Sequence, residues 1–528
     1  MRYRVSQIKI APEEGMDQIK AAVEKKVAKA LRRKTGQMEI RDIEIIRESI
    51  DARKKPDVKL VYTVDFEFDG SLPFEKAVKK RYEPVKCTGV QSGGEHGTCV
   101  DGGRPVIAGF GPCGMFAALI LAEAGLRPIV LERGKAVEER IQDVQKFQSG
   151  LSSQPDPESN IQFGEGGAGT FSDGKLTTGI KDVRIRKVLE EFVRAGADPE
   201  ILYKSKPHIG TDRLQTIVSN LRKRMEALGG EIRFVQRLER IIVEEDEENG
   251  THLTGMVVHD NGSGERTELP VKTLVLATGH SARDTFRMLH DMGVKMEKKP
   301  FSIGVRIEHP QEMINRVQYG DPKLAELLGA ADYKLNHRCE NGRGVYTFCM
   351  CPGGTVINAS TEPATQVTNG MSNSARDGAM ANSGLLVDVR TSDLGEGALA
   401  GIEFQRTYER LAWQNQAVST YGNFKRESSD PVRNSLPAFA AEAILEAMPY
   451  LGRKLKGFDR EDAKLTAVES RSSSPVRILR DQDMQSSIKG LIPAGEGPGY
   501  AGGIMSAAVD GIKAAEKIIM KINEKGVE

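Results

Sequence analysis

Three glycines in the segment GFGPCG, residues 109–114, constrain the fold of this chain more than any other feature of its sequence. A short apolar strand is expected at 105–108 and an apolar helix over 112–125. A second strand is expected at 128–131 and ends in Glu132, which follows the first glycine by 23 residues. Strand, glycine turn, helix, strand and acid in this order predict a βαβ unit that binds a dinucleotide.

Physical reasons explain why each of these residue types stands at its position in the unit. Gly109 allows the tight turn, Gly111 lets a pyrophosphate approach the backbone, and Gly114 lets the helix pack closely on the sheet. The helix start at Pro112 and Cys113 offers free N–H groups and a partial positive charge to phosphates. The turn alone does not distinguish NAD from FAD.

Two later segments favour FAD through a resemblance. TLVLATG at 273–279 is an apolar strand that closes in Ala-Thr-Gly. GLIPAGEGPGYAGGIMSAA at 490–508 is a strand, a Gly-Glu turn and a helix opened by glycines. Together with the turn at 109–114, they resemble the FAD-binding domain of the glutathione-reductase-like flavoproteins.

Three longer motifs narrow this resemblance. GEGGAGTFSDGKL at 164–176, ESRSSSPVRI at 469–478 and AGEGPGYAGGIMSAAVDG at 494–511 resemble a bacterial group of uncharacterised FAD-dependent dehydrogenases, or NAD(P)/FAD-dependent oxidoreductases. The resemblance extends over most of the chain. It implies FAD as cofactor and an oxidoreductase that moves a hydride between flavin N5 and an unidentified small organic substrate.

The resemblance also implies a cofactor site. The expected cofactor-binding residues are Gly109, Gly111, Pro112, Cys113, Gly114, Glu132, Arg133, Gly166, Gly167, Gly169, Thr170, Ser172, Gly279, Gly495, Glu496, Gly502, Gly503 and Ile504. Glu496 replaces an Asp that is common in the wider family, which keeps the acceptor and changes its reach. Asp173 and Lys175 belong either to this site or to a surface turn. Catalytic residues remain unknown, and the candidates are Arg471, Ser472 and Ser473.

The chain is too long for one core and predicts several domains. The expected fold class is α/β, with a discontinuous Rossmann-like FAD-binding domain at 105–295 and 466–528. An inserted α+β substrate or cap domain is expected at 296–465, because 216 residues between the Ala-Thr-Gly segment and the Gly-Glu turn exceed any loop. A ferredoxin-like α+β module is expected at 1–83, followed by a linker at 84–104.

The N-terminal module is basic, with 16 Lys or Arg against 10 Asp or Glu in residues 1–60. We interpret the excess as a solvated helix face, because no aromatic interleaving accompanies it. The alternative is a nucleic-acid patch, which would make the chain an FAD-dependent RNA-modifying protein. A flavin-binding sensor without turnover is a third hypothesis.

Two cysteines fall in a predicted hairpin at 346–358, which turns at Pro-Gly-Gly. Cys349 and Cys351 are two apart and are expected on the same side, with His337 and Cys339 nearby in sequence. We expect packed or substrate-side thiols, while a redox pair and a metal site are the alternatives.

No metal site is predicted. The linker carries Cys87, His96 and Cys99, which fall short of a four-ligand zinc set. The six cysteines of the whole chain indicate a reducing compartment, and we expect a cytoplasmic protein.

The expected partner is a small-molecule substrate. A net charge of +1 disfavours nucleic acid, and no uncharged apolar run approaches the length of a membrane span. No second Gly-x-Gly-x-x-Gly opens another βαβ unit, so no dedicated NAD(P)H domain is predicted. NAD(P)H would then bind transiently, or an electron-transfer partner would take its place.

Overall fold

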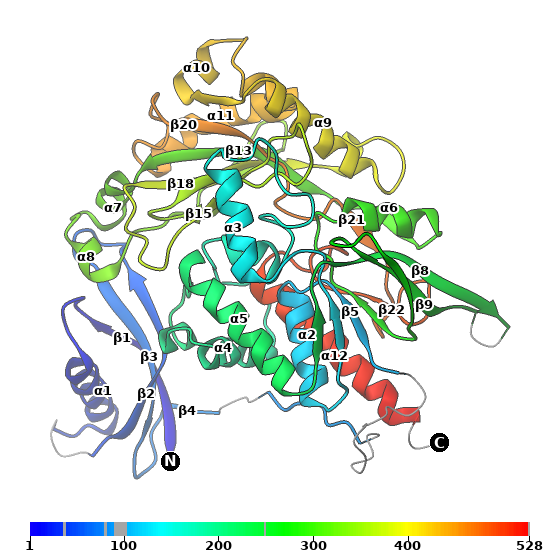
Figure 1. The fold of residues 1–528 in the computed structure, drawn as a ribbon. Helices are drawn as coiled ribbons and strands as arrows, with labels where there is room; N and C mark the ends of the chain where they lie inside the picture. Colours follow the sequence, from blue (N-terminus) through cyan, green and yellow to red (C-terminus); the bar gives the residue numbers. More distant parts are fainter. Residues whose placement is uncertain (35–38, 79–81, 89–102, 248–249, 526–528) are drawn as a thin grey trace.

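The computed structural model describes residues 1–34, 39–78, 82–88, 103–247 and 250–525. Figure 1 shows a small N-terminal sheet at one side, a parallel sheet with its helices at the lower right, and a larger sheet above. Most of the expected linker at 84–104, including His96 and Cys99, lies outside the described residues. No helix in these described ranges combines the length and the apolar character that a membrane span requires.

The N-terminal module is a four-stranded sheet with one helix. Its elements are β1 (Arg2–Ile10), α1 (Met16–Leu31), β2 (Arg41–Asp51), β3 (Lys59–Glu67) and β4 (Glu75–Lys76). The strand order is β2-β3-β1-β4, and β3 is antiparallel to both β1 and β2. Strands β1 and β2 therefore run parallel with β3 between them, which is a split βαβ arrangement.

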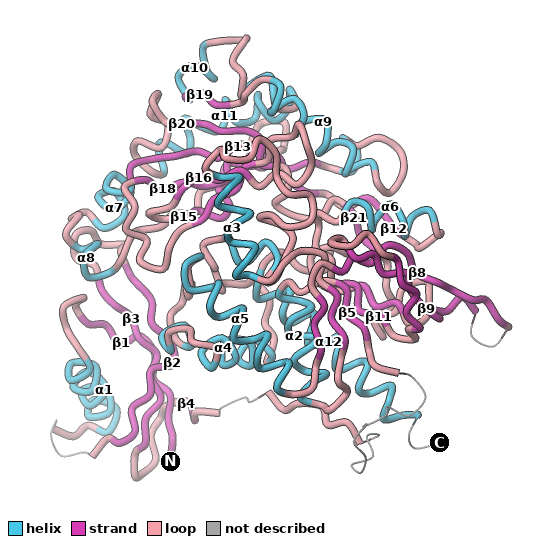
Figure 2. The backbone as a smooth tube through the Cα atoms, viewed as in Figure 1, coloured by secondary structure: helices cyan, strands magenta, loops and turns pink. Residues whose placement is uncertain are grey.

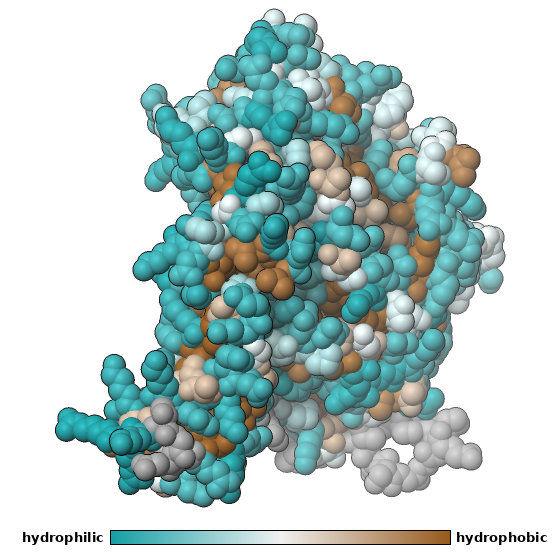
Figure 3. All heavy atoms as spheres, turned by 90° about the vertical axis from the view of Figure 1, so that its left-hand side faces the viewer, coloured by the Kyte–Doolittle hydropathy of each residue, from teal (hydrophilic) through white to brown (hydrophobic). Residues whose placement is uncertain are grey.

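The basic residues of this module lie on its water-facing side. Ile19, Val23 and Val27 of α1 are buried against the sheet. Lys20 and Lys25 are exposed on the same helix. Figure 3, which shows the molecule from the N-terminal side, is predominantly hydrophilic with small apolar areas between.

A five-stranded parallel sheet holds the glycine turn. Its strands are β5 (Val106–Ala108), β6 (Ile129–Leu131), β7 (Glu231–Arg233), β11 (Leu274–Leu276) and β22 (Leu491–Pro493). The order is β22-β11-β5-β6-β7, and all neighbours are parallel. Such strands need continuous apolar sequence because both faces of the sheet are covered.

Both faces of the parallel sheet are indeed covered. The helices associated with this part are α2 (Pro112–Glu123), α3 (Val137–Gln148), α4 (Arg184–Arg194), α5 (Thr211–Ala227) and α12 (Ile504–Lys525). Of these, α2, α4, α5 and α12 share one core with the sheet. The other face is covered by α6 (Arg283–Asp291) and an antiparallel sheet of β8 (Gln236–Asp246), β9 (Gly250–Asp260) and β10 (Arg266–Pro270). This mixed α/β architecture fits a Rossmann-like FAD-binding fold.

A six-stranded sheet forms the upper part of the molecule (Figure 2). Its strands, in spatial order, are β14 (Asn336–Arg338), β15 (Gly344–Cys351), β18 (Met380–Val389), β13 (Phe301–Pro310), β20 (Lys464–Glu469) and β19 (Val418–Thr420). Helices in this part are α7 (Gln311–Tyr319), α8 (Leu324–Leu328), α9 (Ala400–Gln414), α10 (Tyr421–Arg426) and α11 (Ala438–Lys454).

The chain leaves and re-enters the lower part through paired strands. β12 (Met296–Lys298) and β21 (Val476–Ile478) form an antiparallel ribbon. The predicted boundary between 465 and 466 falls inside β20, which pairs with β13 and β19. The proposed division into domains stays a prediction.

The predicted hairpin at 346–358 is wrong. β15 is followed by β16 (Thr355–Asn358), but β16 pairs with β17 (Thr368–Met371) in a separate two-stranded sheet. β15 cannot take β16 as a neighbour because β14 and β18 already occupy its two edges.

Candidate functional site

The carboxyl ends of three parallel strands meet at the glycine turn. A Cβ atom on Gly109 would lie 2.5 Å from the carbonyl oxygen of Ala277, so the ends of β5 and β11 touch. A Cβ on Gly495 would lie 2.8 Å from the Cβ of Cys113, which joins the end of β22 to α2. Parallel sheets of this kind bind ligands at such strand ends.

The start of α2 offers an anion site. Gly111 is the N-cap with φ −78°, and no side chain caps the helix. The first N–H groups of a helix have no partner within it, so they remain for a ligand. A Cβ on Gly114 would lie 1.9 Å from the carbonyl oxygen of Gly109, so only glycine lets the helix lie this close. The Cys113 side chain is buried.

Glu132 at the end of β6 holds the turn together. Its Oε2 accepts the N–H of Phe110 at 2.8 Å, and its Oε1 accepts those of Gly134 and Gly164, each at 3.0 Å. The side chain is 4% exposed. A carboxylate offers about four acceptor positions, so one remains for a ribose hydroxyl. Arg133 instead pairs with Glu158 and does not face the turn as a free cation.

The loop at 164–172 closes over the turn. A Cβ on Gly167 would lie 3.1 Å from the Cα of Gly111, and one on Gly169 would lie 3.3 Å from Cγ1 of Ile504 at the start of α12. The loop therefore touches the starts of both helices.

Three side chains fix this loop, and the sequence did not single out the most important of them. Arg140 of α3 is fully buried and donates to two carbonyls of the loop, those of Glu165 and Gly167, at 2.6 and 3.0 Å, and to two carbonyls just before it, at 2.8 and 2.9 Å. The Thr170 hydroxyl donates to Glu165 O at 3.1 Å, and the Ser172 hydroxyl donates to Gly169 O at 2.7 Å. These contacts give Thr170 and Ser172 a positioning role.

Glu496 after β22 has the opposite surroundings to Glu132. Within the described residues its carboxylate has no hydrogen-bond partner, and desolvation raises its pKa to about 7 against the weak opposing effect of Lys299. Desolvation lowers the pKa of Lys299, whose Nζ lies 3.4 Å from Ser474 O. Ser474 in turn donates to Gly497 O at 2.7 Å. Lys299 was missed because it is 197 residues from Glu496 in sequence.

Open space surrounds three glycines of the site. A Cβ on Gly279, Gly502 or Gly503 would meet nothing within 4 Å. His280 follows Gly279, and desolvation, followed by the nearby Arg471 and Arg283, lowers its pKa to about 3. An imidazole with this pKa is neutral at physiological pH. His280 could not be singled out from the sequence because no second histidine or acid stands at a diagnostic spacing.

Arg471 is held in a buried network. Its Nε and Nη2 donate to the two oxygens of Glu409 at 2.9 and 2.8 Å, and its Nη1 donates to Thr361 at 2.8 Å. Despite opposing desolvation, Arg283 and Arg471 hold the pKa of Glu409 well below its usual range. With these donors engaged, Arg471 joins the two parts of the molecule and has little left for a substrate.

Ser472 and Ser473 are half-buried beside Arg471. The Ser472 hydroxyl donates weakly to Ser302 O at 3.4 Å. The third serine of the run, Ser474, contacts the strand end that carries Glu496, so the run lies beside the cofactor-side turn.

Cys349 and Cys351 lie where the pairing of β15 becomes irregular, and both thiols act on the charge of Lys175. Cys349 has φ +43° at a register shift between β15 and β18, and this bulge breaks the alternation of the strand. Cys349 is exposed, Cys351 is buried, and desolvation raises the pKa of Cys349 to about 11.

Lys175 and Asp173 lie beside these thiols, not on a surface turn. Asp173 is 3% exposed and pairs with Lys175 at 2.7 Å and with Arg376. Besides desolvation, the charges that act on Lys175 include both cysteines. The structure thus brings the end of the loop motif next to the six-stranded sheet.

FAD fits the residues of this site. An uncapped helix start faces the turn for the phosphates, and Glu132 keeps one acceptor position. The unpaired carboxylate of Glu496 matches a hydroxyl donor. The space next to Gly502 and Gly503 leaves room for a ring system at the start of α12.

Comparison with known proteins gives two family matches. Residues 300–427 match the family described as "FAD-dependent protein, C-terminal domain-like", which supports FAD as the cofactor. Residues 2–67 match a domain family of unknown function, DUF8436. The names of these families give the RNA-modifying alternative no support.

A relative from Clostridium beijerinckii, named "Uncharacterized protein", is 42% identical over 560 residues, with 99% of each chain covered. The chain belongs to the family of this clostridial protein.

Solved structures resemble the chain only distantly. Thermovibrio ammonificans THI4 has a TM-score of 0.25 and 16% identity, over 37% of this chain and 66% of that one. The glycerol-3-phosphate dehydrogenase of Bacillus halodurans complexed with FAD has a TM-score of 0.32 and 12% identity, over 81% and 65%. The chain thus spans just under two thirds of these two proteins. A 3-ketosteroid delta1-dehydrogenase from Sterolibacterium denitrificans has a TM-score of 0.34 and 13% identity, over 79% and 99%.

Proposed function

We propose that the chain is an FAD-dependent oxidoreductase, a dehydrogenase or reductase that exchanges a hydride with a small organic substrate at flavin N5. The observation that carries this proposal is the meeting of the ends of β5, β11 and β22 with two helix starts around open glycine backbone. When bound, FAD supplies the hydride acceptor or donor, while the protein supplies orientation and electrostatics.

Different residues of the chain bind different parts of FAD. The start of α2 and the turn at Gly111 hold the pyrophosphate, and Glu132 accepts from the adenosine ribose. Glu496 accepts from the ribityl chain as a carboxylate, or donates to the pyrophosphate when it is protonated. The start of α12 stabilises negative charge on the adjacent edge of the ring by ~0.3–2 kcal/mol.

The substrate side is formed by the six-stranded sheet. Cys349 is exposed there and Lys175 lies beside it, so a polar or anionic substrate group would find a cation in a poorly solvated place. The reductant is NAD(P)H bound transiently or an electron-transfer partner. The cysteine content supports the cytoplasm as the compartment.

The test begins with the absorption spectrum of the purified protein and the identity of the released cofactor. We expect a yellow protein that releases FAD, followed by anaerobic reduction by NADH, NADPH or one of a panel of metabolites. A colourless protein that binds NAD tightly would overturn the proposal. Bound FAD that no donor reduces and no organic acceptor reoxidises would favour the sensor hypothesis.

Gly502→Val tests whether the start of α12 faces the flavin ring, separately from whether the protein binds FAD. Its side chain enters the open space at the start of α12, whereas Gly503 has φ +133° and a substitution there would add backbone strain. We expect a lower midpoint potential of bound FAD, or loss of FAD. An unchanged potential at full occupancy would remove α12 from the flavin site.

A further inference from the structure

Three metal-binding side chains converge at the outer edge of the six-stranded sheet, apart from the cofactor site. His337 and Cys339 come from β14 and the turn after it, and Glu446 comes from α11. One ligand atom from each lies within 4.8 Å of the other two. His337 Nε2 and Glu446 Oε1 are 3.8 Å apart.

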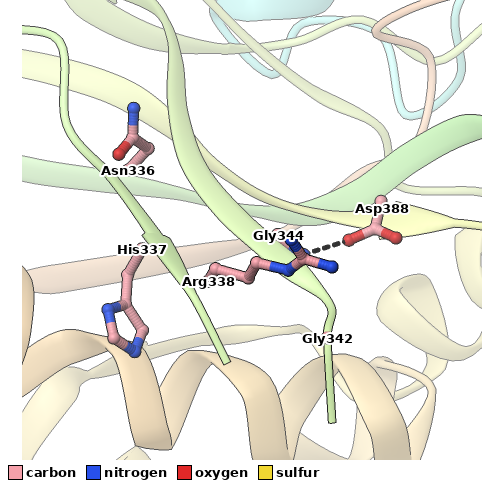
Figure 4. A pocket seen from close by; sticks show the side chains of 6 residues that line it. All are labelled: Asn336, His337, Arg338, Gly342, Gly344 and Asp388. Carbon is pink, nitrogen blue, oxygen red and sulfur yellow. Dashed lines mark hydrogen bonds between the residues drawn. The ribbon is translucent and has the colours of Figure 1, made fainter. Parts of the chain in front are cut away.

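The local fold explains this convergence. Residues two apart on a strand point to the same face, so His337 and Cys339 both face the helical layer while Arg338 points away. Figure 4 shows His337 directed toward the helices below the strand and Arg338 extending in another direction. Glu446 follows Cys339 by 107 residues, which is why the sequence alone did not predict a metal site.

Surrounding contacts hold each ligand in place. The His337 ring stacks on Tyr450 with centroids 4.0 Å apart and an interplanar angle of 12°. Glu446 Oε1 accepts the N–H of Glu340 at 2.9 Å, and Cys339 Sγ lies 3.6 Å from Ala443 O. The hydrogen bond from the backbone to Glu446 is an outer contact of the kind that orients metal ligands.

An open recess adjoins the cluster. It has a volume of about 360 Å³ and is lined by Asn336, His337, Arg338, Gly342, Gly344 and Asp388 (Figure 4). His337 therefore borders both the ligand cluster and a solvent-accessible space. A metal bound by three protein ligands could take water or a small anion from this side.

We propose that His337, Cys339 and Glu446 bind one Zn²⁺ ion, with the fourth position open to the recess. Thiolate, imidazole and carboxylate together suit Zn²⁺, whereas Mg²⁺ and Ca²⁺ require oxygen ligands. Bond lengths of about 2.0–2.3 Å in a tetrahedron place donor atoms roughly 3.4–3.6 Å apart. The distance of 3.8 Å between His337 Nε2 and Glu446 Oε1 is close to this value.

The experiment uses the full-length protein with its cofactor. After treatment with a chelator and dialysis, ZnCl₂ is titrated in a calorimeter and the bound zinc is measured by mass spectrometry. We expect one Zn²⁺ per chain and a rise of the thermal midpoint with zinc, because the ion binds the folded state. Cys339→Ser should weaken binding by about 100-fold or more, since loss of an outer contact alone costs 10–100-fold.

Two matched variants keep the test decisive. Cys339 is 4% exposed, so its substitution could disturb packing, whereas His337→Ala changes a half-buried side chain and should also abolish binding. Glu340→Gln removes the same charge as Glu446→Gln from a side chain outside the ligand cluster and should leave zinc affinity within twofold. Absence of a zinc equivalent in the parent protein, or equal affinity in Glu446→Gln and Glu340→Gln, would overturn the proposal.

Discussion

Two acidic residues at strand ends, Glu132 after β6 and Glu496 after β22, share a side chain but have opposite surroundings. Glu132 accepts three backbone N–H groups and is thereby fixed before any ligand arrives. Glu496 has no hydrogen bond among the described residues, and desolvation raises its pKa to about 7. One end of the site is thus preorganised, while the other gains its partner only with a ligand.

The two carboxylates differ in the groups that stabilise their negative charge. At β6 three backbone N–H groups, those of Phe110, Gly134 and Gly164, donate charge-assisted hydrogen bonds to the carboxylate. At β22 the chain leaves a carboxylate poorly solvated, with Lys299 as a weak counter-charge. We therefore expect ligand binding at this second end to be coupled to the loss of a proton from Glu496.

The largest effect is expected from Glu132→Ala. The substitution leaves three backbone donors without their acceptor, and hydrogen bonds to charged groups contribute ~1.5–3 kcal/mol each. We expect a loss of about 3–5 kcal/mol in the free energy of unfolding, together with loss of FAD. Chemical denaturation of the apo-protein measures the first, and absorbance of bound flavin the second.

Glu132→Gln is the control for this effect. Its amide oxygen can still accept from Gly134 and Gly164, but its NH₂ group faces the donor N–H of Phe110. An intermediate loss of stability is expected. Full stability of Glu132→Ala would mean that the turn does not depend on the carboxylate.

The next largest effect is expected from Gly111→Val. A Cβ here would meet only Gly167 Cα at 3.8 Å, so the variant should fold, but its side chain occupies the approach to the helix start. FAD affinity should fall at least about 100-fold, or about 2.7 kcal/mol. Gly395→Val, at an exposed glycine with no neighbour within 4 Å, is the matched control in a fluorescence titration. Equal FAD affinity of the two variants would contradict the assignment of this turn.

Sequence reasoning located the features that depend on local spacing. The strands at Val106–Ala108 and Ile129–Leu131, and the helix from Pro112, follow from apolar runs and glycine punctuation that act over a few residues. The three hydrogen bonds that Glu132 accepts could not be predicted from the sequence, because their donors come from separate turns. The family match supports FAD, and the individual contacts to it stay predictions.

Features that depend on distant segments could not be predicted. Arg140 donates to a carbonyl 20 residues away in the chain, and Lys299 contacts Ser474, 175 residues further along the chain. The irregularity at Cys349 interrupts the alternation of β15, and the sequence pattern does not show it. In each case the deciding partner lies on an element whose position follows from the whole fold.

A third prediction concerns pH. Because the pKa of Glu496 is raised to about 7, its contribution to apo-protein stability is fully present below its unfolded value of about 4.5 and is lost as the pH rises through about 7. The loss amounts to at most about 3 kcal/mol. Hydroxyl donors from FAD would favour the charged form, so FAD affinity should increase up to about tenfold per pH unit below pH 7 and level off above it.

Glu496→Gln isolates this effect from Glu165, whose pKa desolvation also raises to about 7. The variant should flatten the pH dependence of FAD affinity and keep the contribution of Glu165 to stability. Parallel pH profiles of parent and variant would show that Glu496 does not contact the cofactor.

The smallest effect is expected at the two cysteines. Cys349 is exposed and Cys351 is buried, with its Sγ 3.3 Å from the carbonyl oxygen of Cys349. Desolvation raises the pKa of Cys349 to about 11, so the thiol is protonated at neutral pH and is a poor nucleophile for redox exchange. The double variant Cys349→Ser and Cys351→Ser should therefore bind FAD and be reduced by NAD(P)H within about twofold of the parent. Stopped-flow absorbance under anaerobic conditions measures both, with Cys87→Ser as the control for thiol removal. If reduction were lost while FAD stayed bound, the pair would act as a redox dithiol, and the substrate side would carry electrons as well as bind its ligand.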